Sequence, residues 1–297
     1  MSDFLNGYSI QRWLESCPQG YLDGTEYGHE PGQKEPDTIV EQEFLRDRAI
    51  QTTVQLVAGE RCALAASSGL IGCAPDDASK IFLATQTLDE ARHVEIFTQR
   101  LIDLGVKKAD LDSVVADLAD PNLIKFAEAL LEKVDKKDFV AGVVGQNLIL
   151  EGMAFSVFEM LQAMNAKWNP KFARTLSGTI ADERRHVGFG ENRIGSLIRQ
   201  YPEKKAEVER MQKEMSFHML ATFANQLRDP SASRELEWVS GNAPEPAADE
   251  EPATWQGAAL GELKLDEIEN LLSSTVLREF KTRLGRVGVD YQTPALP

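Results

Sequence analysis

Two copies of one five-residue pattern hold the residues of this chain that are most able to do chemistry. Residues 89–93 and residues 182–186 both read Asp-Glu-x-Arg-His. In a helix, a glutamate and a histidine three residues apart lie on one face, one turn from each other. Two such pairs can close around a shared pair of metal ions in the middle of a helix bundle. The sequence therefore predicts a two-metal centre.

Two further glutamates precede these patterns at similar distances. Glu60 comes 30 residues before Glu90, and Glu151 comes 32 residues before Glu183. An antiparallel helix hairpin needs roughly 30 residues between facing midpoints, so both distances suit hairpins. The 61 residues between Glu90 and Glu151 leave room for a crossover with its own helix. The candidate metal ligands are Glu60, Glu90, His93, Glu151, Glu183 and His186.

This set of ligands indicates the kind of metal. Four carboxylates buried together as free anions would be very unfavourable, and two divalent cations would balance their charge. Oxygen-rich ligands with one imidazole per metal favour iron or manganese over a zinc thiolate site. Asp89 and Asp182 are placed to accept a hydrogen bond from the second nitrogen of a ligand histidine in the other half of the site. Arg92 and Arg185 can pair with these aspartates and keep them ionised.

The segments that contain these residues are predicted to be helices. Apolar residues recur at helical spacing, and no alternating pattern of trustworthy strand length occurs, so the predicted fold is all-α. The expected helices cover residues 36–69, 77–104, 138–166, 169–200, 203–227 and 263–283, with one or two shorter helices in 107–134. We predict an N-terminal arm (1–35), a helix-bundle domain (36–228), and an acidic, Pro-rich linker with a C-terminal helix and tail (229–297).

Composition and charge exclude several classes of function. The net charge of −15 argues against nucleic acid and anionic membranes as partners. No uninterrupted apolar stretch of about 18 residues occurs, which predicts no membrane span, and no signal peptide is recognised. Cys17, Cys62 and Cys73 have neither a metal-site spacing nor a disulfide framework. These observations predict a cytoplasmic protein with free thiols.

An apolar pocket is expected beside the metals. Ala63, Phe97, Phe155 and Phe189 each lie three or four residues from a candidate ligand on the same helix. Phenylalanine resists oxidation better than tyrosine, tryptophan or methionine, so this lining would suit a strong oxidant directed at a bound substrate. The alternative for each phenylalanine is ordinary core packing.

A plainer alternative treats both five-residue patterns as surface salt bridges on two helices. It leaves the inward placement of all four glutamates unexplained. Over residues 36–228 the arrangement instead resembles the ferritin-like, carboxylate-bridged diiron family, which includes multicomponent monooxygenase hydroxylases, arylamine N-oxygenases, ribonucleotide reductase small subunits and ligand-binding oxidases. The resemblance implies a ferritin-like four-helix bundle with a crossover and additional helices. It also implies two irons at the six candidate ligands, with Glu90 and Glu183 as bridges, or a mixed Mn/Fe pair.

The resemblance further implies an activity. Members of this family activate O2, which suggests a non-haem diiron oxygenase or oxidase of the monooxygenase type, acting on a small or medium organic substrate by hydroxylation, N-oxygenation or a related oxidation. Electrons would come from a separate reductase or ferredoxin, because the chain carries no flavin, haem or iron–sulfur motif. Homodimers are common in the family.

Departures from the family patterns leave other activities open. Phe97 stands where radical-storing reductase subunits carry tyrosine. Ala63 and Gln146 stand where ligand-binding oxidases form a Val–Tyr crosslink, and Thr179 replaces the extra histidine of the arylamine N-oxygenases. The alternatives are a tyrosine-less ribonucleotide reductase small subunit-like radical generator, a mixed Mn/Fe oxidase and, ranked last, a ferroxidase.

Overall fold

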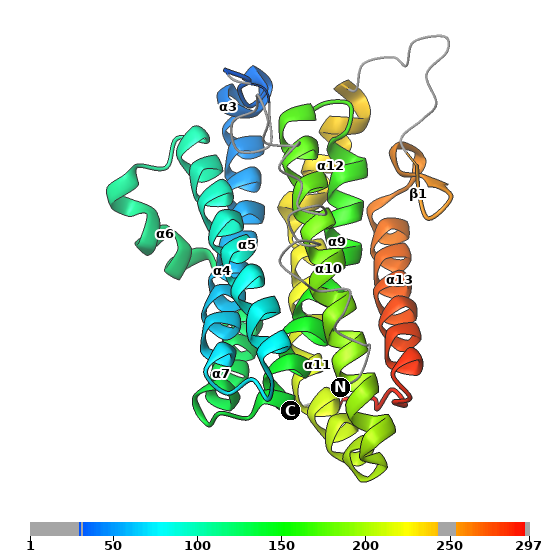
Figure 1. The fold of residues 1–297 in the computed structure, drawn as a ribbon. Helices are drawn as coiled ribbons and strands as arrows, with labels where there is room; N and C mark the ends of the chain where they lie inside the picture. Colours follow the sequence, from blue (N-terminus) through cyan, green and yellow to red (C-terminus); the bar gives the residue numbers. More distant parts are fainter. Residues whose placement is uncertain (1–29, 31, 243–253, 295–297) are drawn as a thin grey trace.

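The computed structural model describes residues 30, 32–242 and 254–294, and these residues form an almost wholly helical structure (Figure 1). Its centre is a bundle of α4 (Glu43–Ile71), α5 (Asp77–Asp103), the segment that ends in α9 (Glu151–Asn165), and α10 (Pro170–Gln200). The only strands in the described ranges are β1 (Thr254–Trp255) and β2 (Ala258–Ala259), which pair with each other. The predicted all-α class is therefore confirmed.

The first hairpin joins α4 to α5 through the short loop 72–76. The Asp76 carboxylate accepts a hydrogen bond from the Ser79 backbone N–H at 2.8 Å, which caps the start of α5. A short helix, α3 (Asp37–Glu41), precedes α4, so the expected helix over 36–69 is interrupted at Gln42.

The crossover between the two hairpins contains α6 (Leu111–Leu118) and α7 (Pro121–Asp135), after the 3-10 turn η2 (Lys108–Asp110). Asp120 caps α7 by accepting from the Asn122 N–H at 2.7 Å, and Pro121 begins the helix. The region 107–134, expected to hold one or two shorter helices, therefore holds two α-helices. Figure 1 shows α6 at the edge of the bundle, while α7 packs against α4 and α11.

The third long helix is irregular, contrary to the single helix expected over 138–166. It consists of α8 (Phe139–Val143), the π-helix η3 (Val144–Leu150) and α9. Every residue of η3 is buried. The stretch Phe139–Asn165 is long and apolar enough to cross a membrane, although uninterrupted apolar runs gave no such candidate. Because 78% of its most apolar window is buried inside the protein, we interpret it as a core helix.

The remaining helices cover the bundle. They are η4 (Pro202–Lys204), α11 (Lys205–Arg228), α12 (Pro230–Asn242), η5 (Leu260–Glu262) and α13 (Leu265–Arg286). Helix α12 is not expected from the sequence, because its residues run directly into the Pro-rich acidic stretch. Most of the predicted N-terminal arm and the acidic stretch at 243–253 lie outside the described residues.

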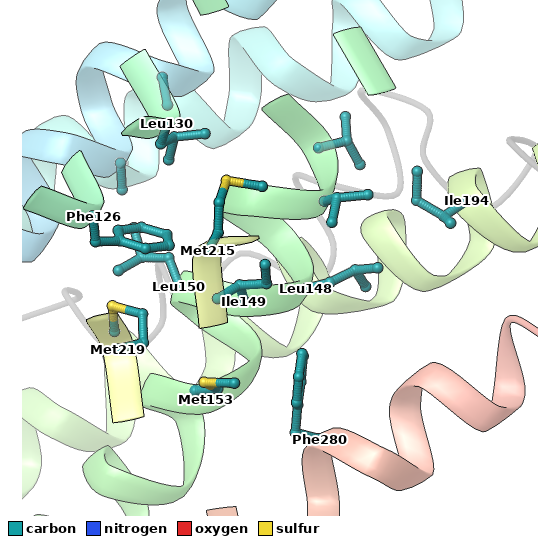
Figure 2. Close-up of a cluster of buried hydrophobic side chains, with 14 of the residues drawn as sticks. Phe126, Leu130, Leu148, Ile149, Leu150, Met153, Ile194, Met215, Met219 and Phe280 are labelled. Carbon is teal, nitrogen blue, oxygen red and sulfur yellow. The ribbon is translucent and has the colours of Figure 1, made fainter. Parts of the chain in front are cut away.

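The largest hydrophobic cluster forms around the π-helix. Figure 2 shows Leu148, Ile149 and Leu150 pointing into a core that also contains Phe126, Met215 and Phe280. These side chains come from η3, α7, α11 and α13. Burying each large apolar side chain contributes about 1.5–3 kcal/mol, so this cluster fixes the π-helix firmly against the outer helices.

Candidate metal centre

The structure brings all six candidate ligands together in the middle of the bundle. Glu60 comes from α4, the Glu90 and His93 pair from α5, and the Glu183 and His186 pair from α10. Glu151 lies where the π-helix passes into α9. None of the six residues is more than 5% exposed. Buried carboxylates and imidazoles from four helical segments therefore face one another across the bundle axis.

The ligand atoms divide into two groups, one around each histidine. His93 Nδ1 lies 3.4 Å from Glu60 Oε2, and His186 Nδ1 lies 3.8 Å from Glu151 Oε1. In each group the ligand atoms lie within 4.8 Å of one another, close enough to hold one metal ion. The two ring centroids are 6.4 Å apart.

Glu90 belongs to both groups, and Glu183 belongs to the His93 group and also reaches His186. Glu90 Oε2 lies 3.5 Å from His93 Nδ1, and Glu90 Oε1 lies 3.3 Å from His186 Nδ1. Glu183 Oε1 lies 3.4 Å from His93 Nδ1, and Glu183 Oε2 lies 3.5 Å from His186 Nδ1. Each of these carboxylates can therefore bridge two metal ions, while Glu60 and Glu151 can each bind one.

Hydrogen bonding indicates that the cluster suits cations. Glu90 Oε2, Glu183 Oε2 and the Nδ1 atoms of His93 and His186 are buried without any hydrogen-bond partner. A buried polar atom left in this way costs about 1–3 kcal/mol. Two metal ions among these atoms would satisfy all four, and carboxylate and imidazole ligands suit iron and manganese. The site can thus hold a pair of metal ions.

The outer nitrogen of each histidine contacts an aspartate from the opposite helix. His93 Nε2 lies 3.2 Å from Asp182 Oδ2, and His186 Nε2 lies 3.3 Å from Asp89 Oδ2. Because an ionised carboxylate only accepts hydrogen bonds, Nε2 of each imidazole carries a proton. Nδ1 of each ring faces the carboxylate cluster, so in the neutral form of the ring its lone pair would be available to a metal.

Two arginines tie these aspartates together. Arg92 donates to Asp89 at 3.0 Å and to Asp182 at 3.0 Å. Arg185 donates to Asp89 at 2.6 Å and to Asp182 at 2.8 Å. Burial by itself would raise the pKa of Asp89, but its hydrogen bond to His186 and the charge of Arg185 hold that pKa well below its usual range. Asp89 therefore stays ionised.

Three side-chain amides hold Glu151, although residue type and spacing in the sequence do not assign them this role. Gln86 donates to Glu151 Oε1 at 2.7 Å, Gln146 to the same oxygen at 3.1 Å, and Asn147 to Oε2 at 2.9 Å. Gln86 also donates to Glu90 at 3.2 Å. The only feature of the sequence that could have indicated this role is the position of Gln86 and Asn147 on the same helix faces as the candidate ligands. Gln146 also donates to the Ala63 carbonyl at 3.1 Å, linking the π-helix to α4.

The carboxylates titrate far from their ordinary range. Burial raises the pKa of Glu60 to about 8. It also raises the pKa of Glu183, and it raises that of Glu151 well above the usual value. For Glu90, burial is outweighed by the positive charges of His186 and His93, which lower its pKa to about 2. Without cations, the cluster would therefore keep protons at neutral pH.

A cavity of about 130 Å³ reaches the cluster from one side. Ala63 lines it, as expected from the sequence, but Phe97, Phe155 and Phe189 are not among its lining residues. Phe97 is fully buried in a separate apolar cluster, and Phe189 stacks on the Phe82 ring at 4.1 Å.

Phe155 lies beneath the guanidinium groups of Arg184 and Arg283 instead. Phe158, less than one turn further along α9, lines the cavity. The three phenylalanines thus follow the alternative stated for each of them, core packing, because neighbouring helices decide which side chains face open space.

Comparisons with known proteins show the fold. No family model matches the chain, and no curated protein matches it. An R2-like ligand-binding oxidase with an aerobically reconstituted Mn/Fe cofactor is 16% identical, with a TM-score of 0.68, over 92% of this chain and 93% of the other. A mutant with an Fe/Fe cofactor is also 16% identical, with a TM-score of 0.68, over 90% and 92%. The chain thus has the R2-like, ferritin-like helical fold predicted from its sequence.

Proposed function

We propose that this protein is an O2-activating dimetal oxidoreductase that oxidises a small or medium organic substrate. The observation that carries the proposal is the pair of buried histidines, each with its Nδ1 atom facing carboxylates and without a hydrogen-bond partner. Glu90 and Glu183 present one oxygen to each histidine, as a bridged metal pair requires. The adjoining cavity supplies a place for substrate.

Each residue has a distinct part in the proposed site. Glu60 and Glu151 would each bind one metal, and Glu90 and Glu183 would bridge both. Asp182 and Asp89 hold His93 and His186 in the required tautomer. When bound, the metal pair would supply the redox chemistry that activates O2. The apolar walls of the cavity would limit the access of water to the reacting groups.

An iron pair is the first choice of metal, and a mixed Mn/Fe pair is the second. The ligand set supports both, because it combines four carboxylates with one imidazole per metal. The R2-like ligand-binding oxidases of similar fold carry either Mn/Fe or Fe/Fe cofactors in their structures. Since no flavin, haem or iron–sulfur motif occurs in the chain, we propose that a separate reductase or ferredoxin delivers the electrons.

The test combines metal content with O2 consumption. Protein loaded anaerobically with iron, or with manganese and iron, and then reduced should bind about two metals per chain and consume O2 faster than metal in buffer. His186→Ala should lower this rate by about tenfold or more. His218→Ala is the matched control, because this histidine lies on α11 outside the cluster. Loaded wild-type protein that consumes no more O2 than buffer would refute the proposal.

A tyrosyl radical stored beside the metals finds little support in the described part of the chain. Tyr201 follows α10 and is 45% exposed, and Tyr291 packs edge-on against Phe280 of α13. Phe97, one turn after His93, is fully buried. A radical generator that works without tyrosine would bind the same metals but would need a partner protein for turnover. Turnover of an organic substrate by the isolated protein with a reductant would decide against it.

A further inference from the structure

The cavity follows one face of α4 for about four helical turns. Its α4 lining starts at Arg48, includes Leu56 and Gly59, and ends at Ala63 beside the metal cluster. Arg48 and Glu60 are 12 residues apart, or roughly 18 Å along a helix. The cavity therefore has an end at the metal ligands and a second end near Arg48.

The walls between these ends are apolar. Leu150 and Phe158 line one side, and Met219 and Phe223 of α11 line the other. Leu123 of α7 and Leu272 of α13 also line the cavity. Such a surface favours apolar molecules, since a polar group placed there would lose its hydrogen bonds to water without replacement.

The cation that lines the cavity is already neutralised. Arg48 pairs with Glu235 of α12 at 3.2 Å, and it also donates to Gln51 and to the Gln226 carbonyl at 3.2 and 3.1 Å. Its guanidinium group is therefore committed to protein partners. The other charged lining residues are the carboxylates Glu60, Glu151 and Glu183, which belong to the metal cluster.

Two of the polar lining residues, Gln55 and Thr222, also form hydrogen bonds with other groups of the protein. The Gln55 amide donates to the Leu118 carbonyl at 2.9 Å, and its oxygen accepts from the Asp120 N–H at 2.8 Å. Thr222 donates to the His218 carbonyl at 2.9 Å. Neither side chain leaves a strong polar group aimed at a substrate. The other two polar lining residues, Thr52 and Gln226, lie at the Arg48 end of the cavity, so beside the metal cluster the only polar lining side chains are the carboxylates themselves.

We infer that the substrate is a neutral, apolar molecule of about the size of a single aromatic ring. This inference rests on the proposed function and names its substrate class. The volume of about 130 Å³ is close to that of an engineered apolar cavity of about 150 Å³ that binds benzene. Two divalent cations would balance the four glutamates, so the inner end would not favour a charged substrate either.

Gly59 controls how much room lies beside Glu60. A Cβ atom added at Gly59 would meet no atom within 4 Å, although the residue lines the cavity. A larger side chain would therefore extend into the cavity without striking the backbone. Replacing a mid-helix glycine also improves helix propensity, so such a variant is expected to fold.

The experiment measures binding of three probes of one shape: toluene, benzoate and benzylammonium. Calorimetric titrations use the metal-loaded protein and, in parallel, the metal-free protein. Toluene should bind, and both ions should bind about tenfold more weakly or worse, because they would carry a charge into an apolar cavity. Gly59→Leu should weaken toluene binding by about tenfold or more, since it fills the space. Gly285→Leu, an open helical position on α13, is the matched control and should bind toluene normally.

Three results would overturn the inference: no binding of toluene, tighter binding of benzoate or benzylammonium than of toluene, or equal toluene binding by wild type and Gly59→Leu. Metal content and O2 consumption of the same preparations separate this failure from failure of the proposed function. A protein that binds two metals and consumes O2, yet prefers benzoate, would keep the function and lose the substrate class. A protein that binds toluene but no metal would keep the apolar ligand class and lose the proposed function.

Discussion

His93 Nε2 on α5 lies 3.2 Å from Asp182 on α10, and these residues are 89 positions apart in the chain. The relationship is reciprocal, because His186 on α10 lies 3.3 Å from Asp89 on α5. Each helix thus orients the candidate metal-binding histidine of the other. The two halves of the centre depend on each other, and a change on one helix should be felt by the ligands of both.

Asp182→Asn should lower metal affinity by about 10–100-fold, since it replaces the acceptor that fixes the His93 tautomer with a neutral amide. Competition with a chelator of known affinity measures the effect. Asp112→Asn is the matched control, because Asp112 pairs with Arg61 at an exposed position. Unchanged affinity in Asp182→Asn would mean that the aspartate does not orient the histidine.

Glu90→Ala and Glu60→Ala should differ in metal stoichiometry. Glu90 reaches both histidines, so its loss should leave well below two metals per chain, with neither bound tightly. Glu60 reaches only His93, so its loss should leave about one metal, bound near His186. Elemental analysis after desalting gives the counts, and circular dichroism establishes that both variants fold. Equal counts would contradict the assignment of bridging and terminal carboxylates.

Gln86→Leu should destabilise the protein by about 1–3 kcal/mol, because it removes the donor shared by Glu90 and Glu151 inside the core. The replacement has a similar volume, so packing is little changed. Chemical denaturation of wild type and variant measures the difference. Gln200→Leu, at an exposed position, should change the free energy of unfolding by less than about 0.5 kcal/mol.

Glu35 should make stability depend on pH in the acid range. Its carboxylate is buried, which raises the pKa, but Arg100 at 3.2 Å and Asn169 at 2.8 Å outweigh burial and lower the pKa below 4.5. A carboxyl group with a lowered folded-state pKa stabilises the protein above its unfolded-state pKa. This contribution should be lost as pH falls from about 4.5 through the folded-state pKa.

Glu35→Gln tests this dependence. At pH 7 the variant should lose about 3 kcal/mol or more, because Arg100 remains buried without its partner. Its free energy of unfolding should then change less than that of wild type between pH 5 and 3. Glu41→Gln, at an exposed position, is the control. Parallel slopes for wild type and Glu35→Gln would show that Glu35 is not the titrating group.

The sequence could predict the helices and the six clustered residues because both signals are local. Glu90 and His93 share a helix face through their spacing alone, whatever surrounds the helix. The distances between successive glutamates predicted the hairpins, because the rise per residue of a helix is fixed.

The π-helix could not be predicted in the same way. Gln146 and Glu151 are five residues apart, which in a regular α-helix places them roughly 140° apart around the axis. The i→i+5 pattern of a π-helix brings them together instead, and Gln146 donates to Glu151 at 3.1 Å. The burial of all seven residues of η3 against neighbouring helices accompanies this local departure from α-helical geometry.

The sequence by itself thus determined the ligand types, their helical faces and the order of the helices, because these depend on residues close together in the chain. Only the tertiary structure decided that Asp182 orients His93, that Glu90 faces both histidines, and that Phe158 rather than Phe155 lines the cavity. These relationships join segments that are distant in sequence. They are decided by how side chains from several helices fill a shared core, which residue spacing along one helix does not specify.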